Sequence, residues 1–265
     1  MVVVSPQGPR NERLIVHAQT IDEVISQLDG IIQWAHENKS RLGYFAALYR
    51  RVTVKVKQGI AGNFFADGKR MEHLDVVFAN RYLDAISAYR AGGQTTRSWQ
   101  IAFDASHDWS AIVLQHLLLG INAHINLDLG IAAAQTAPGN AIEDLMGDFD
   151  RINHVLASLV KTVEDELTQV WPMLKLLDWI AGKSDEAVIN FSIDLARMAA
   201  WDVARQLAYL DQTILAQQIS EIDERVSLLG HSIQHPGFIV GSVTNCIRLG
   251  ERRGISEVIS ILQRE

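Results

Sequence analysis

The sequence has very little cysteine and proline, and its glycine and proline together are below the average of globular proteins. Its single cysteine, Cys246, excludes an intramolecular disulfide framework and a zinc site built from several cysteines. Glycine and proline contribute 18 and 5 of the 265 residues, and both are typical turn residues. Because a fold with many short strands needs many turns, this scarcity favours long helices.

Positive charge is also sparse. The chain carries 24 lysine and arginine residues against 31 aspartate and glutamate residues, a net charge of -7. A nucleic-acid groove needs clustered basic side chains, and the densest basic group here is only Arg248, Arg252 and Arg253. We therefore expect no nucleic-acid partner and a small molecule as the substrate.

Long uninterrupted apolar runs are absent as well. The most apolar stretch, residues 111–119, is broken by Gln115 and His116, whereas a membrane span needs about 20 apolar residues. The first nine residues lack the positive and apolar regions of a signal peptide. We expect a cytoplasmic protein without a membrane span, folded around a full core of its 48% hydrophobic residues.

Apolar residues recur every three or four positions along most of the chain, which predicts helices. Thr20 and Glu23 form a capping-box pattern before a helix that runs to about Asn38. Residues 52–56 alternate as a strand would, but helical periodicity on both sides favours a helix. Residues 94–108 are expected to form a linker with a short apolar piece. The predicted helices are 41–60, 69–91, 109–134, 141–171, 173–181 and 185–216, with more helix to 229 and two short helices after residue 238.

These elements predict an all-α, single-domain bundle of about eight to ten helices. Residues 1–19 are expected to be irregular, residues 20–235 to form the bundle core, and residues 236–265 to pack on it as a helical tail. Whether the chain forms a homo-oligomer stays open.

The predicted helix over 109–134 is apolar on nearly every side, which is typical of a buried central helix. Buried polar groups are costly unless they are paired, so the polar residues on this helix need partners. They form either a hydrogen-bonded core layer or a functional site. The polar residues are His116, Asn122, His124, Asn126 and Asp128, of which His116, His124 and Asp128 share one stripe with Gly120.

Three other segments place polar residues on one helical face. In the segment 71–90, His73, Asn80 and Asp84 share a face, Arg81 lies nearby, and Asp75 and Arg90 are expected on a solvated surface. Segment 144–154 offers Asp148 and Asp150, and segment 194–202 offers Arg197 and Trp201. Each face is either a solvated or structural surface or part of a site.

Several stretches of the sequence are similar to an uncharacterised all-helical bacterial family, a domain of unknown function. The stretches are HLDVVFANRYLDA at 73–85, HLLLGINAHINLDL at 116–129, DFDRIN at 148–153 and ARMAAW at 196–201. The resemblance spans about residues 20–210. It implies a helical fold and no established activity.

A weaker likeness joins LGINAHINLD, residues 119–128, to the helix of zinc-dependent phospholipase C and the related single-strand nucleases. In those enzymes a His-x-x-x-Asp pair binds zinc, which implies zinc ligation by His124 and Asp128. No second pair of this kind follows residue 128, so the likeness implies one or two metal ions rather than three.

The leading hypothesis is a metal-dependent enzyme that hydrolyses an ester or phosphoester with a metal-activated water. Its cofactor is one or two divalent ions of zinc, manganese or iron, since the available ligands are imidazoles and carboxylates. The metal ligands are His73, His116, His124 and Asp128; the catalytic residues are Asp84, Asp148, Asp150 and Arg197; the substrate-binding residues are Asn80, Arg81, Asn122 and Trp201.

Two alternatives remain. The same polar layer suits acid-base chemistry in a metal-free lyase, isomerase or cyclase of specialised metabolism. A non-enzymatic protein that binds an apolar ligand between its helices is the third hypothesis.

Overall fold

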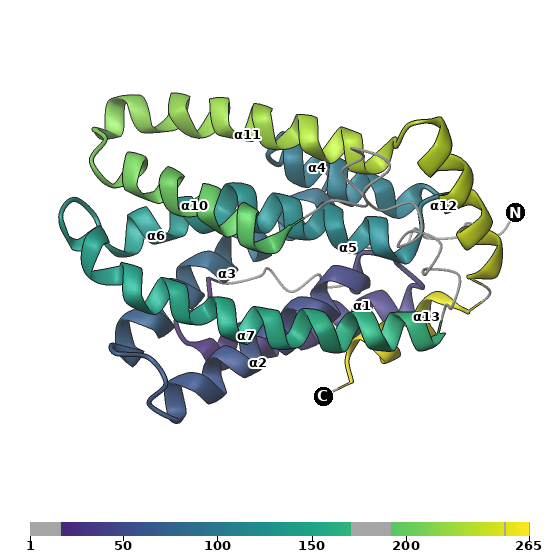
Figure 1. Cartoon of the computed structure of the whole chain (residues 1–265), viewed down its shortest axis with the longest axis horizontal. Helices are drawn as coiled ribbons and strands as arrows, with labels where there is room; N and C mark the ends of the chain where they lie inside the picture. The colour runs from purple at the N-terminus through teal and green to yellow at the C-terminus, as the bar shows by residue number, and fades with distance from the viewer. Residues whose placement is uncertain (1–16, 171–191, 252, 265) are drawn as a thin grey trace, which may run out of the picture.

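The structure is a computed structural model that describes residues 17–170, 192–251 and 253–264. Within these ranges every regular element is a helix and no strand occurs, which confirms the all-α bundle. The predicted helix over 173–181 and the start of the one over 185–216 lie outside the described residues. Figure 1 shows the longer helices running roughly along the long axis of the molecule.

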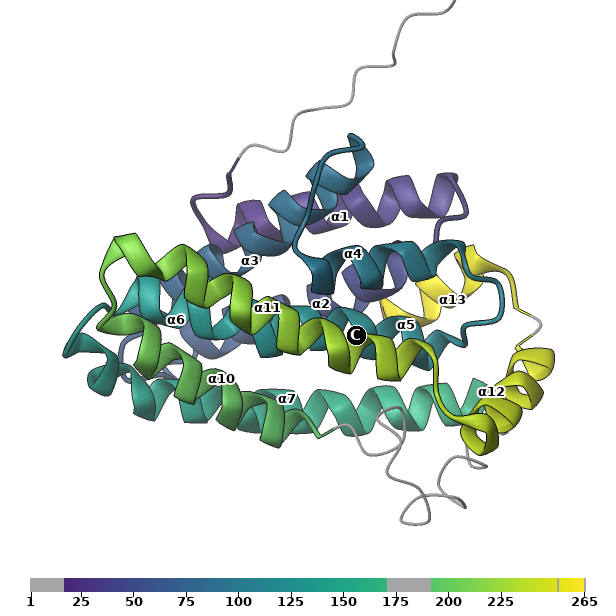
Figure 2. The ribbon, with the colours of Figure 1, turned by 90° about the horizontal axis from the view of Figure 1, so that it is seen from above.

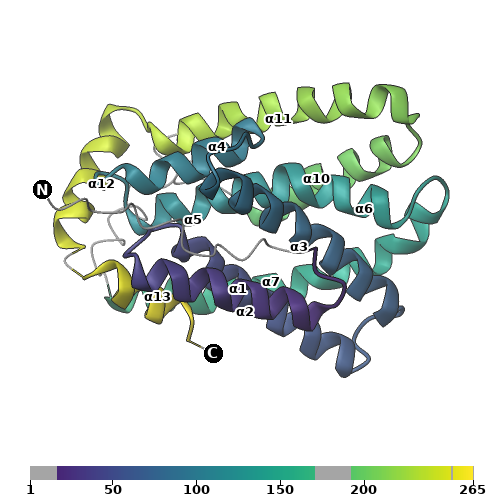
Figure 3. The same ribbon diagram turned by 180° about the vertical axis from the view of Figure 1, so that it is seen from behind.

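The first three helices are α1 (Ile21–Glu37), α2 (Gly43–Ala61) and α3 (Gly68–Arg90). Helix α1 begins as predicted, because the Thr20 hydroxyl accepts a hydrogen bond from the Glu23 N–H at 3.2 Å. The alternating residues 52–56 lie inside α2 and are helical. In Figure 3, α1 lies toward the viewer, with α3 and α4 beside it.

A continuous helical run forms the centre of the bundle. It consists of α5 (Val113–Ile121), the π-helix η2 (Asn122–Leu129) and α6 (Gly130–Thr136). Figure 2 shows α1 and α7 (Ala141–Val170) on opposite sides of the bundle, with α5 and α6 between them. The π-helix packs against α3, α4, α10 and α11, so its side chains meet several segments that are distant in sequence.

The central run differs from the predicted α-helix over 109–134 in two ways. It starts at Val113, because the Gln115 side chain accepts a hydrogen bond from the Ile112 N–H at 3.1 Å and caps the helix there. Asp108, which directly precedes the predicted start, instead accepts from the Ser110 N–H, within a turn. The middle third is a π-helix, in which the backbone bonds reach one residue further than in an α-helix.

Residues Val113–Thr136 are long and apolar enough to cross a membrane by length and composition, and 83% of the most apolar window is buried inside the bundle. A core helix surrounded by other helices has the same composition. Burial within the fold therefore accounts for the hydropathy of this run.

The predicted linker over 94–108 contains a helix, α4 (Arg97–Asp104). Its first two N–H groups, of Arg97 and Ser98, donate to the carboxylate of Asp223 at 2.7 and 3.0 Å. Asp223 lies on α11, 125 residues after Ser98. Because the cap comes from so far along the chain, the local sequence did not reveal it.

The C-terminal helices are α10 (Ile193–Ala208), α11 (Gln212–Gln234), α12 (Phe238–Gly250) and α13 (Ile255–Leu262). The predicted continuous helix through 216 is wrong, because the chain breaks at Tyr209–Asp211 and α11 turns back along α10 (Figure 1). The two short helices predicted after residue 238 are confirmed, and α13 packs on α1 and α2.

Candidate functional site

The imidazole of His124, on the π-helix, is enclosed by aromatic rings, and the residue is 3% exposed. The ring of Phe78 stacks on the imidazole with 3.6 Å between centroids. Tyr49 presents its ring nearly at right angles, with 4.4 Å between centroids. We call the five rings within 6.2 Å the aromatic cage: Phe45, Tyr49, Phe78, Tyr82 and Trp99.

Asp128 lies four residues after His124 and is held by donors from two other helices. Its Oδ1 accepts from Arg81 Nε at 2.7 Å, and its Oδ2 accepts from Trp99 Nε1 at 2.8 Å. The Nδ1 of His124 is 3.7 Å from the same Oδ2, which is too long for a hydrogen bond. The carboxylate is therefore fixed by α3 and α4 and faces the imidazole without bonding it.

Five polar atoms around His124 are buried and have no hydrogen-bond partner among the described residues. They are both ring nitrogens of His124, the hydroxyls of Tyr49 and Tyr82, and Oδ2 of Asp75. Leaving such an atom unpaired costs about 1–3 kcal/mol. Buried polar groups in native proteins are nearly always paired. This concentration of unpaired atoms therefore makes the cage the candidate functional site.

Burial sets the charge state of these groups. It lowers the pKa of His124, and the charge of Arg81 lowers it further against the opposing effect of Asp128. Burial alone would raise the pKa of Asp128, but the charge of Arg81 together with His124 and the Trp99 hydrogen bond outweighs it, and the pKa is lowered. Burial raises the pKa of Asp75 from 3.8 to about 7, with a further contribution from Glu72. Near neutral pH, His124 is therefore a neutral base beside an ionised Asp128.

Glycines on either side of the π-helix let two neighbouring helices approach closely. A Cβ on Gly120 would lie 2.4 Å from the ring of Phe45, which packs directly on this glycine. A Cβ on Gly130 would lie 2.8 Å from the Ala200 carbonyl oxygen on α10. Single π-turns occur frequently at functional sites, and here one carries both His124 and Asp128.

Residues 21–236 match the family of unknown function DUF5995. The chain belongs to this family. The match confirms the resemblance inferred from residues 73–85 and 116–129, and it assigns no activity. No curated protein and no solved structure matches the chain. The weaker likeness to zinc-dependent phospholipase C stays a prediction.

The four predicted metal ligands do not come together. His124 and Asp128 are neighbours, but His73 is exposed on α3, and His116 packs against Tyr44 at 5.6 Å between ring centroids. Among the described residues, no group of three histidine, cysteine, aspartate or glutamate side chains is placed to hold a metal ion. Both oxygens of Asp128 accept from Arg81 and Trp99, and of the four predicted ligands only His124 lies beside it; the metal site stays a prediction.

The predicted catalytic carboxylates lie outside the cage. Asp84 is exposed and pairs with His17 at 2.9 Å. Asp150 is exposed on α7. Asp148 is buried, but it accepts from the N–H groups of Ala66 and Asp67 at 2.7 and 2.9 Å. Together with ion pairs from α3 and α7, these bonds give Asp148 a structural role, so its assignment as a catalytic residue is corrected.

Of the predicted substrate-binding residues, Arg81 contacts Asp128 in the site. The two asparagines instead form hydrogen bonds with backbone groups. The Asn80 amide bonds both backbone groups of Ala18, at 2.8 and 2.9 Å. The Asn122 amide donates to the Val226 carbonyl of α11 at 3.0 Å. Both residues are buried because they tie chain segments together, and neither faces the cage with a free group.

Arg197 and Trp201 form a separate cluster with Phe149. The guanidinium of Arg197 lies 4.4 Å from the centre of the Phe149 ring and donates to the Phe149 carbonyl. The ring of Trp201 is 4.8 Å from the same phenyl ring. These contacts join α10 to α7, so the predicted pairing of Arg197 with an anionic substrate is replaced by a packing role.

Asp75 was expected on a solvated face, but it is 7% exposed. A signal was present, because Asp75 continues an apolar stripe with Met71, Phe78 and Tyr82 at spacings of three and four. Tyr49 and Trp99 were not singled out, since aromatic residues at helical spacing are usual in any core.

Proposed function

We propose that this protein is an enzyme that transfers protons on a small, largely apolar molecule, with His124 as the general base. The observation that carries the proposal is the pair of unpaired ring nitrogens on a fully enclosed, neutral imidazole. A neutral imidazole accepts a proton near pH 7 and is the most common general base in enzymes.

Asp128 supports this role by its charge. Once His124 accepts a proton, the imidazolium faces an ionised carboxylate whose Oδ2 lies 3.7 Å from Nδ1, which stabilises the charged form. Arg81 keeps Asp128 ionised and in place. Asp128 is therefore a positioning residue that acts through His124.

The opposite step needs a group that gives a proton back. Asp75 has a pKa of about 7 and an unpaired Oδ2, so it exchanges protons near neutral pH. Its charge also raises the pKa of Tyr49, after burial itself, and Asp75 lies on α3 one turn before Phe78 of the cage. Reactions of the lyase, isomerase or cyclase type need such an acid and base in one apolar site.

Among the five rings of the cage, Phe78 is partly exposed and the other four are buried. Phe78 also covers one whole face of the imidazole. We infer that a substrate reaches His124 by displacing the Phe78 ring, because it is the one ring of the cage that is partly exposed.

The metal-dependent hydrolase has less support, because only His124 and Asp128 of its four ligands are neighbours and Asp128 is already bonded. An apolar-ligand carrier would use the same cage. Binding an apolar ligand, however, does not require a neutral histidine beside an ionised aspartate.

The proposal is tested by proton exchange in heavy water. The protein is incubated with a pooled extract of small metabolites in D2O, and mass spectrometry records compounds that gain deuterium at carbon. We expect gains with the natural protein and none with His124→Gln, because proton transfer through the imidazole exchanges the substrate hydrogen with solvent.

His73→Gln is the matched control, since this exposed histidine lies on α3 outside the cage. It should behave as the natural protein does. Equal deuterium gain with and without His124 would contradict the proposal. Stoichiometric zinc, manganese or iron in elemental analysis, lost in His124→Gln, would favour the hydrolase. Binding of an apolar compound unchanged in His124→Gln, with no exchange, would favour the carrier.

A further inference from the structure

His116, on α5, is a second buried histidine with an unpartnered ring nitrogen. It is 6% exposed, and its Nε2 is buried without a hydrogen-bond partner among the described residues. His124 follows about two helical turns later on the same continuous run, roughly 12 Å further along the helix axis at about 1.5 Å per residue. The central run therefore carries an unpaired imidazole nitrogen at two levels of the bundle.

The unpaired nitrogen of His116 is a hydrogen-bond acceptor. Burial is the main cause that lowers the pKa of His116 to about 3, so the imidazole is neutral near pH 7. A hydrogen bond with the Ala111 backbone raises this pKa again, as a ring N–H does when it donates to a carbonyl. Because Nε2 has no partner, that N–H is on Nδ1. The other nitrogen of a neutral imidazole has no proton, so Nε2 needs a partner that donates.

A hollow of about 20 Å³ lies beside His116 and shares walls with the aromatic cage. Three rings of the cage line it, those of Phe45, Tyr82 and Trp99, together with Gly120. The volume holds one group of the size of a water molecule. The hydroxyl of Tyr82 is also buried and has no partner within the described part of the chain. Two residues that line this hollow thus have an unpaired polar atom.

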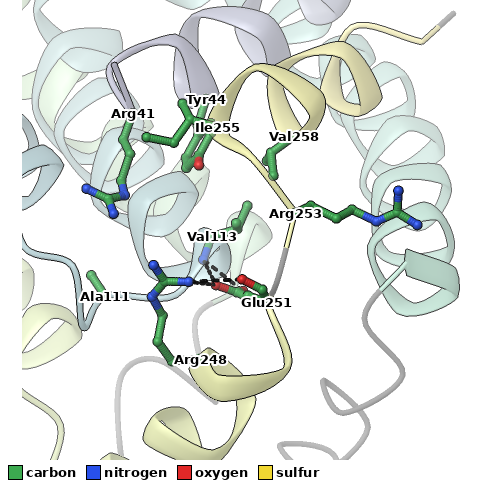
Figure 4. Close-up of a pocket in the computed structure, with 9 residues that line it drawn as sticks. All are labelled: Arg41, Tyr44, Ala111, Val113, Arg248, Glu251, Arg253, Ile255 and Val258. Carbon is green, nitrogen blue, oxygen red and sulfur yellow. Dashed lines mark hydrogen bonds and ion pairs between the residues drawn. The ribbon is translucent and has the colours of Figure 1, made fainter. Parts of the chain in front are cut away.

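The charged group beside the hollow is already bonded. Arg41 lines the hollow, but its Nη1 donates to the Ser106 carbonyl at 2.9 Å. A neighbouring hollow that Arg41 also lines is different, because there the Glu251 carboxylate accepts from the Val113 N–H at 3.1 Å (Figure 4). The chain supplies the partner in that hollow and none in this one. Since Nε2 of His116 accepts, the missing partner is a neutral donor and not an anion.

We propose that His116 binds a hydroxyl group of the substrate, which is an alcohol or a phenol. The hydroxyl occupies the hollow and donates to Nε2, and its oxygen can in turn accept from a donor such as the Tyr82 hydroxyl. A ketone or an ether cannot donate and does not suit this position. The inference rests on the proposed function, because the molecule that carries the hydroxyl is taken to be the substrate of His124.

One ring separates the hollow from His124. Phe45 lines the hollow, and its ring centroid is 5.6 Å from that of the His124 imidazole. The same ring packs directly on Gly120. The apolar part of the substrate therefore lies along the position of Phe45, with its hydroxyl at His116 and its reacting carbon at His124.

The experiment compares phenol with fluorobenzene, which has the same ring and no hydrogen-bond donor. NMR titrations give the affinity of each. We expect His116→Phe, which keeps a ring against Tyr44, to lower the ratio of phenol affinity to fluorobenzene affinity about tenfold, because the hydroxyl loses its acceptor. His107→Phe is the matched control, since this histidine is exposed. It should leave the ratio within about twofold of that of the natural protein.

A second measurement needs no change at His116. In His124→Gln at about pH 5, ordinary histidines are protonated, whereas His116 is neutral because its pKa is about 3. Phenol should shift the nitrogen-15 signal of the unprotonated His116 nitrogen, which then accepts a hydrogen bond, and fluorobenzene should not. The proposal is overturned if phenol does not bind, if this signal does not move, or if His116→Phe and His107→Phe give the same affinity ratio.

These titrations are independent of proton transfer, so they separate this inference from the proposed function. Selective phenol binding without any deuterium exchange would contradict the role of His124 alone. Deuterium exchange that is lost in His124→Gln, together with no preference for phenol, would contradict the role of His116 alone.

Discussion

Two kinds of buried polar residue lie in the same bundle. Asp148 accepts four hydrogen bonds and Asp223 accepts three, and each carboxylate bonds two backbone N–H groups at or beside the start of a helix. His124 is equally buried and accepts none. The difference teaches that burial of a polar residue is not in itself a sign of function. The sign is a buried polar residue that the fold leaves unpaired.

The same comparison separates stability from activity. Asp148 and Asp223 fix the start of α3 and of α4, so changing them should alter folding. The unpaired atoms of the cage cost free energy, so changing them should alter chemistry with little harm to folding. Four substitutions measure this contrast, beginning with the largest expected effect.

Asp148→Ala removes a carboxylate that bonds the N–H groups of Ala66 and Asp67 and leaves these groups buried without an acceptor. We expect a loss of about 3 kcal/mol in the free energy of unfolding, measured by urea denaturation. Asp150→Ala, an exposed neighbour on α7, is the control and should change it by less than about 0.5 kcal/mol. If both substitutions change the free energy of unfolding equally, the structural role of Asp148 is contradicted.

Gly120→Ala places a Cβ 2.4 Å from the ring of Phe45 and forces that ring to move within the cage. Overpacking of this kind costs about 1–3 kcal/mol, and thermal unfolding should show a lower midpoint. Gly147→Ala on α7 is the matched control, because its Cβ meets nothing within 4 Å. It should stabilise the helix by about 0.5–1 kcal/mol. A harmless Gly120→Ala would mean that the cage is loosely packed.

Asp75→Asn changes how stability depends on pH. The pKa of Asp75 is raised in the folded state from 3.8 to about 7, so the folded protein holds a proton that the unfolded chain has released. Stability contributed by this group is present at low pH and is lost as pH rises from about 4 to 7, by at most about 1.4 kcal/mol per pH unit. We expect the variant to lack this decline in urea denaturation at several pH values. An unchanged decline would show that Asp75 is ionised when buried.

His124→Leu should have the smallest effect on folding. It removes two unpaired polar atoms from an apolar cage and keeps a similar volume, so the free energy of unfolding should change by less than about 1 kcal/mol in either direction. Deuterium exchange at carbon should vanish. A decrease of more than about 3 kcal/mol in the free energy of unfolding would show that His124, like Asp148, stabilises the fold.

Much of the fold could be predicted from the sequence, because apolar spacing and capping residues act over a few positions. Thr20 capped α1 as predicted, and residues 52–56 followed the helical pattern of their surroundings. The cap of α4 by Asp223 and the π-turn of Asn122–Leu129 could not be predicted. The cap comes from a residue 125 positions away in the chain, and the apolar spacing of residues 122–129 does not distinguish a π-helix from an α-helix.

The site could be predicted only in part. The spacing of His124 and Asp128 showed that they share a face, and burial of both is confirmed. The apolar stripe of Met71, Phe78 and Tyr82 indicates the inward face of α3. A charged residue within such a stripe is read more easily as surface, so Asp75 was expected outside the site and His73 inside it. Likewise, the sequence does not distinguish Asp148 from Asp128 as site residues. Only the three-dimensional contacts show which of the two carboxylates lies beside an unpaired group.

The central claim is that His124 is a neutral, unbonded base at physiological pH. Nitrogen-15 NMR of the histidine rings reads both protonation and hydrogen bonding, and comparison with His124→Gln identifies the signals of this residue. We expect the signals of a neutral imidazole at pH 7 and a titration midpoint below the ordinary histidine value, because burial lowers the pKa of His124. An imidazolium that persists at pH 7, with a pKa above the ordinary histidine value, would make His124 and Asp128 an ordinary buried ion pair and contradict the account.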